Sequence, residues 1–189
     1  MVVPILCYGA ELWGYEYCDT IEKIHVKFCK YLLGVSSSTP TVAVLGELGR
    51  HPICTIYYVK CIKYWLKLQQ MDNKRLPRQC YKLLYEYDSS GRKTWATEVK
   101  NLLFRMGYGH VWTNQGVGDP CLFIKCFKDR LSDISQQEWN TSISSTSKLR
   151  TYATFKSDLS YEKYLTLNTA KILKATVRKV QMWCFTIRT

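Results

Sequence analysis

Apolar residues recur at intervals of three and four along most of this chain. That interval places side chains on one face of a helix, because an α-helix has 3.6 residues per turn. Alternation of the kind found in strands fits only the first few positions and residues 183–187. The pattern therefore predicts an all-α fold, an irregular bundle of several helices with a flexible polar linker and a C-terminal helix.

The first helical pattern follows Asp19, which can cap a helix, and Glu22 completes the spacing of a capping box. Gly34 can end this helix, and a Ser/Thr-rich joint leads to Thr39-Pro40, where the next helix can begin. The steps of three and four place an apolar stripe on one face of the first helix, namely Ile21, Ile24, Phe28, Leu32 and Val35.

A third segment opens at Pro52 and is apolar or aromatic on most of its circumference as far as Met71. A helix of this composition is buried on most sides, so we expect it at the centre of the bundle. Shorter amphipathic patterns lie on either side of it, separated by turn residues. They predict further helices at 42–48, 77–87, 95–106, 122–134 and beyond residue 151.

The composition changes at 136–150, where Ser, Thr, Gln and Asn dominate. Such a stretch buries little apolar surface, so we expect a partly flexible linker or the weakly formed start of a helix. It would separate a helical domain at 19–135 from a basic helical segment at 151–189. The basic residues of that segment include Lys163, Lys171, Lys174, Arg178 and Lys179.

Positive charge is in clear excess, because Lys and Arg outnumber Asp and Glu by 27 to 15 and give a formal charge of +12. A field of this sign concentrates polyanions such as nucleic acid or acidic lipid surfaces. Two groups of lysines recur at helical spacing, so each would form one basic edge of a helix. We call them the first stripe, Lys23, Lys27 and Lys30, and the second stripe, Lys60, Lys63 and Lys67. These edges would either contact a phosphate backbone or serve as ordinary solvated helix faces.

The nine cysteines are scattered and include no C-x-x-C pair, and the three histidines are far apart in the sequence. This usage is typical of reduced, buried thiols and predicts no metal site and no cofactor. The apolar start of the chain lacks a basic flank and reaches Glu11 early, unlike a secretory signal. Since no later run is long enough to span a bilayer, we expect an intracellular protein, cytoplasmic or nuclear, without a membrane partner.

Local catalytic signatures are missing from the sequence. It contains no glycine-rich phosphate loop, no G-x-S-x-G and no H-E-x-x-H, and its carboxylates include no adjacent Asp pair for two-metal chemistry. We therefore expect no enzyme activity. Fourteen tyrosines and six tryptophans are more than a core of this size needs. Their rings either stack on unpaired bases or pack in the interior.

Three segments resemble one known family in order and spacing. They are PILCYGAELWG at 4–14, IEKIHVKFCKYLLGVSSSTPTVAVLGELGRHP at 21–52 and IKYWLKL at 62–68. Together they are similar to the region just after the polymerase core in non-LTR (LINE-type) retrotransposon reverse transcriptases, which are RNA-directed DNA polymerases. The agreement covers roughly residues 4–70, and weaker agreement continues at Trp95, in GYGHVWTNQGV and in SYEKYL near residue 161.

The resemblance implies a thumb-like helical domain at 19–135 that grips a template–primer duplex, and a remnant of the junction with the polymerase core at 1–18. The family's catalytic aspartates lie upstream of the matched region, and no residue here corresponds to them. The final VQMWCFTIRT departs from the family. The resemblance thus predicts a truncated fragment of a transposable element without catalytic residues.

Three functional hypotheses remain open from the sequence. The fragment could bind RNA or DNA duplex weakly and without sequence preference, through the six lysines of the two stripes. It could instead be a protein-interaction module whose apolar faces drive self-association, with no role in nucleic-acid binding. It could also be a decayed reading frame without a task.

Overall fold

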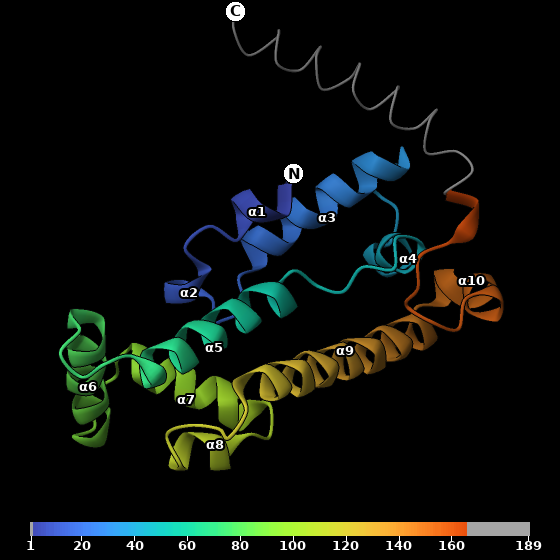
Figure 1. The fold of residues 1–189 in the computed structure, drawn as a ribbon. Coiled ribbons are helices and arrows are strands. Elements are labelled where there is room, and N and C mark those ends of the chain that lie inside the picture. The colour runs from blue at the N-terminus through green and yellow to red at the C-terminus, as the bar shows by residue number, and fades with distance from the viewer. Residues whose placement is uncertain (1, 166–189) are drawn as a thin grey trace, which may run out of the picture. The chain divides into compact units, whose positions relative to one another are not determined.

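The structure is a computed structural model that describes residues 2–165 (Figure 1). Within this range the regular structure is helical, and the only β contact is an isolated bridge between Leu48 and Tyr161. The all-α prediction is confirmed. The predicted basic positions Lys171, Lys174, Arg178 and Lys179 lie outside the described residues.

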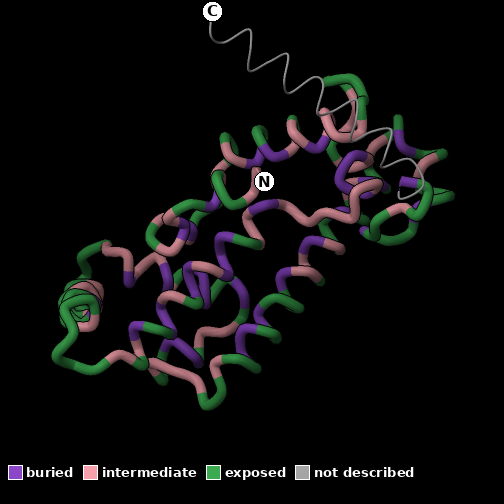
Figure 2. Tube along the Cα trace, turned by 45° about the horizontal axis from the view of Figure 1, so that its top comes forward, coloured by how far each residue is buried: buried purple, intermediate pink, exposed green. Residues whose placement is uncertain are grey.

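The helices follow one another without long connections. Their bounds are α1 (Val2–Leu6), α2 (Ala10–Trp13), α3 (Asp19–Leu33), α4 (Thr41–Glu47), α5 (Cys54–Gln70), α6 (Leu76–Ser89), α7 (Trp95–Arg105), α8 (Gly109–Thr113), α9 (Pro120–Ser145), the 3-10 turn η1 (Ser147–Leu149) and α10 (Arg150–Phe155). Buried and exposed positions alternate along these helices (Figure 2), as expected when each helix buries one face.

The chain forms two compact units that are each discontinuous in sequence. Unit 1 combines Val3–Asp19 with Ile53–Ile134, and unit 2 combines Thr20–Pro52 with residues 135–165 of the described part of the chain. The residues of the predicted 19–135 domain therefore belong to both units, because residues 20–52 pack with the later part of the chain.

Helix α5 is the centre of unit 1, as its apolar circumference predicted. It packs against α2, α6 and α7, and Tyr57, Ile62 and Trp65 are fully buried. Its approach to α2 depends on Gly14. A Cβ atom at Gly14 would lie 2.4 Å from the carbonyl oxygen of Ala10 and 2.7 Å from that of Tyr57, so only glycine fits there.

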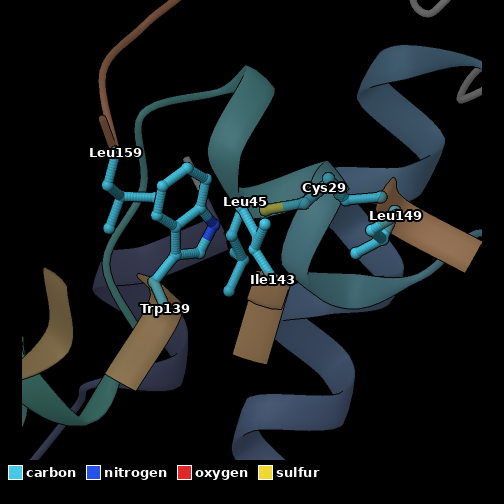
Figure 3. Close-up of a cluster of buried hydrophobic side chains, with 7 residues drawn as sticks. Cys29, Leu45, Trp139, Ile143, Leu149 and Leu159 are labelled. Carbon is cyan, nitrogen blue, oxygen red and sulfur yellow. The ribbon is translucent and has the colours of Figure 1, made fainter. Parts of the chain in front are cut away.

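The core of unit 2 forms around α4. Figure 3 shows Cys29 of α3, Leu45 of α4, and Trp139 and Ile143 of α9 packed together with Leu149 and Leu159. The Trp139 indole Nε1 also donates a hydrogen bond to the Val42 carbonyl at 2.8 Å. Gly46 allows the close packing, because a Cβ atom there would lie 2.8 Å from the Trp139 ring.

The predicted polar linker is wrong for residues 136–145, which continue α9 as helix to Ser145. Trp139 and Ile143, four residues apart, supply the buried face that the composition concealed. The hydroxyl groups of Thr141, Ser142 and Ser144 each donate to the carbonyl four residues earlier. These polar side chains are therefore satisfied by the helix itself.

The apolar stripe predicted on α3 is not the most buried face of this helix, since Ile21, Phe28 and Leu32 are only half-buried. The buried residues of this helix are Glu22, His25 and Cys29. Ile24 of the predicted face is 46% exposed, and Val35 lies beyond the end of the helix and is 38% exposed. The polar residues tolerate burial because they contact one another: His25 Nδ1 is 3.3 Å from Glu22 Oε1, and His25 Nε2 is 3.6 Å from Cys29 Sγ.

Candidate nucleic-acid interface

Two lysines of the second stripe lie at a hollow of about 390 Å³ in unit 1. Helix α5 contributes Lys60 and Lys63 to its wall, and α9 contributes Lys128. We call this site the lysine hollow. The rest of its lining combines apolar side chains with two hydroxyl residues, namely Thr55, Ile56, Val59, Leu131 and Ser132.

Lys60 is half-buried and is held by the N-terminal segment of unit 1. Its Nζ donates to the Cys7 carbonyl oxygen at 2.8 Å and lies 4.0 Å from Glu11 Oε1. The charge of Lys60 also affects the thiol of Cys7. Burial raises the pKa of this thiol, and the ammonium group of Lys60 offsets part of that rise. Lys60 thus both anchors residues 7–11 to α5 and contributes positive charge to the hollow.

Lys63 and Lys128 are exposed. Neither makes a hydrogen bond or ion pair with another residue of the described part of the chain. Two such ammonium groups above an apolar floor, formed by Val59 and Leu131, can bind an oxyanion such as phosphate while the floor contacts an attached sugar or chain.

The remaining predicted lysines have different surroundings. Lys67 is exposed on α5 but does not line the hollow. The first stripe belongs to unit 2, where Lys23 and Lys27 are exposed. Lys30 is half-buried, and its Nζ donates to the Ser37 carbonyl oxygen at 2.7 Å, which fixes the joint after α3.

Sequence reasoning missed Lys128. The only signal was its spacing of three from Lys125 and from Leu131, which predicts a helix with a basic edge beside an apolar one. No sequence pattern showed that this edge of α9 would face the same hollow as α5, because that pairing depends on tertiary packing.

Two clusters in unit 2 combine residue types used by hydrolases, and in each the Cys or Ser is buried. Burial lowers the pKa of His25, yet its hydrogen bonds to Cys29 and Glu22 outweigh burial and raise the pKa to about 9. His51 Nδ1 is hydrogen-bonded to Ser135 Oγ, and burial lowers the pKa of His51. Cys29 is 0% and Ser135 5% exposed, so both side chains belong to the interior of unit 2.

Within residues 2–165, no three His, Cys, Asp or Glu side chains are grouped so that they could hold a metal ion. None of the helices described there is both long enough and apolar enough to cross a bilayer.

Comparison with known proteins adds no relative. No family model matches the chain, and no curated protein or solved structure matches it either.

Proposed function

We propose that this chain derives from the helical region that follows the polymerase core of a LINE-type reverse transcriptase, and that it binds nucleic acid through phosphate contacts. The observation that carries the binding proposal is the lysine hollow, where Lys60, Lys63 and Lys128 line one concave surface. The resemblance of residues 4–70 to that family and the formal charge of +12 support it.

The chemistry of the hollow favours binding without sequence preference. Lysine is a point charge that attracts phosphate and releases condensed counterions, whereas sequence is distinguished by contacts to base edges. Three phosphate contacts would give a slope of log affinity against log salt on the order of −2 to −3.

The test is fluorescence anisotropy with a labelled RNA–DNA hybrid duplex over a salt series. Lys63→Glu/Lys128→Glu should weaken binding at least tenfold and flatten the salt slope. The matched control is Lys74→Glu/Lys148→Glu, which changes the net charge equally at two exposed lysines outside the hollow. Equal losses in both variants would show that net charge alone drives binding and would reject the hollow.

The absence of polymerase activity is part of the same proposal. No residue of the chain corresponds to the family's catalytic aspartates, so the purified chain should not extend a primer on a template. Template-dependent incorporation of nucleotides by the pure chain would contradict the proposal.

A second candidate function is protein interaction, and it rests on a separate observation in unit 1. Ile5, Tyr8 and Leu12, in or next to α1 and α2, are 73%, 87% and 63% exposed. Neighbouring exposed apolar side chains of this size are typical of contact surfaces. Light scattering should then show self-association that Tyr8→Ser/Leu12→Ser abolishes, whereas a wild-type monomer at all concentrations would count against it.

A further inference from the structure

A second, smaller hollow in unit 1 is built from amide and aromatic side chains. Its volume is about 200 Å³, and its lining includes Gln69 of α5, Arg78, Tyr81 and Tyr85 of α6, and Gln115 after α8. We call it the amide–tyrosine hollow. It is smaller than the cavities that hold drug-sized ligands, so it suits a ligand of one or two rings.

A hydrogen-bond network fixes the back of this hollow. Tyr81 accepts from Trp65 Nε1 at 2.9 Å and donates to Gln115 Oε1 at 2.6 Å. Gln69 Nε2 donates to the same oxygen at 3.0 Å, and Gln115 Nε2 donates to the Trp112 carbonyl at 2.7 Å. Both lone pairs of the Gln115 side-chain oxygen are thus used, and the amide is locked in one orientation.

Gln115 adopts a left-handed backbone conformation, which residues with a side chain rarely take. Its φ is +51°, and no other non-glycine residue in the described range has a positive φ. A residue stays in this region only where its surroundings hold it there, and such residues cluster at ligand sites. The network on the Gln115 side chain is the feature that holds it.

Gln69 and Arg78 in the lining of the hollow keep atoms that can still form hydrogen bonds. Gln69 Oε1 accepts from Arg78 Nη1 at 2.6 Å, which leaves one lone pair of that oxygen open, while its amide nitrogen is bonded to Gln115 and also contacts the Tyr81 hydroxyl. Arg78 Nε is buried without a hydrogen-bond partner among the described residues. The Gln69 amide oxygen therefore keeps an acceptor position, which can accept a hydrogen bond from an amino group at the edge of a nucleobase.

Aromatic surface lies next to this amide edge. Tyr85 is half-buried, with its ring centre 5.7 Å from that of Trp112 and 6.3 Å from that of Tyr81. Arg78 lies over the Tyr81 ring at 5.6 Å. The charges at the rim are mixed, since Lys82 and Glu86 lie four residues apart on the same helix. A neutral ring carrying one phosphate fits this balance better than a multiply charged anion.

We propose that the amide–tyrosine hollow binds one unpaired nucleobase, stacked on Tyr85 and hydrogen-bonded to Gln69, with Arg78 and Lys82 beside its phosphate. The inference extends the proposed function, because the base would belong to a single strand bound by the same chain. A paired base cannot enter, since its hydrogen-bonding edge and both faces are occupied in a duplex.

The first test compares Tyr85→Leu, which removes the ring, with Tyr85→Phe, which retains it. Anisotropy with a labelled single-stranded 12-mer should show about tenfold weaker binding for Tyr85→Leu and unchanged binding for Tyr85→Phe, as expected for loss of one stacked base. Both variants should bind the hybrid duplex like the wild type. Circular dichroism checks that Tyr85→Leu is folded, and Gln69→Leu provides a second variant with the same expected loss.

The second arm uses a 12-mer of the same charge without bases. The wild type should bind this strand as weakly as Tyr85→Leu binds the normal strand. Adenosine monophosphate should compete with the normal strand for the wild type. Equal affinity of the wild type for both strands would overturn the inference while leaving the lysine hollow intact. If the wild type bound neither the single strand nor the hybrid duplex, the proposed function itself would be rejected.

Discussion

The two lysine stripes both recur at steps of three and four residues, but they lie in different units and their surroundings differ. On α5, Lys60 is anchored to the Cys7 carbonyl, while Lys63 lies with Lys128 at a hollow. On α3, Lys30 is bound to the Ser37 carbonyl at the end of the helix. The basic edge of a helix thus becomes a candidate site only when a second helix contributes further positive charge and forms a hollow with it.

The cores of the two units differ in a related way. Unit 1 is built around a helix whose apolar and aromatic residues cover most of its circumference. In unit 2, α3 buries polar residues and depends on the Glu22–His25–Cys29 cluster, and α4 is packed by Trp139. The first kind of core can be disrupted by removing volume, and the second also by changing protonation.

The largest expected effect is the loss of volume in unit 1. Trp65→Ala should lower the free energy of unfolding by about 3–5 kcal/mol, because it empties a fully buried site and removes the donor to Tyr81. Urea denaturation measures the change. The control Leu76→Ala, at a side chain 70% exposed, should stay within about 0.5 kcal/mol of the wild type. A similar loss in both variants would contradict the central place of α5.

Protonation should affect unit 2 through His25. Its folded pKa of about 9 is above the unfolded value near 6.5, so its contribution is complete below pH 6.5 and is lost as pH rises through 9. The contribution is at most about 3 kcal/mol. Wild type and His25→Gln should therefore converge in unfolding free energy between pH 6.5 and 9.5. A difference that stays constant over this range would contradict the charged state of His25.

A smaller effect is expected from overpacking at α4. Gly46→Ala places a methyl group against the Trp139 ring and the Tyr152 hydroxyl, and should destabilise unit 2 by about 1–3 kcal/mol. Gly116→Ala is the matched control, because a Cβ atom there meets nothing within 4 Å and its φ is not positive. Thermal unfolding compares the two, and equal melting temperatures would show that the packing around Gly46 is looser than described.

Sequence patterns correctly predicted those helices and helix ends that are marked by one strong feature of the sequence. The central helix followed from its apolar circumference, and the predicted stop at Gly34 fits its positive φ of 66°. The polar segment 136–145 and the buried face of α3 were not predictable in this way. In both, polar side chains are satisfied by partners within their own helix, so hydrophobicity alone gives the wrong answer.

The candidate site was predictable only in part. Lys60 and Lys63 followed from helical spacing, but Lys128 lies 65 positions after Lys63 and joins them through the packing of α9. The amide–tyrosine hollow had no sequence signal, since its residues come from α5, from α6 and from the connection after α8.

The most direct test of the account compares one reversal in each stripe, Lys63→Glu and Lys27→Glu, which change the net charge equally at exposed lysines. The measurement is the affinity for a labelled RNA–DNA hybrid over a salt series. Lys63→Glu should weaken binding several-fold with a shallower salt slope, and Lys27→Glu should change the affinity less than twofold. Equal effects of the two charge reversals would contradict binding at the lysine hollow and would attribute the affinity to the net charge of the chain alone.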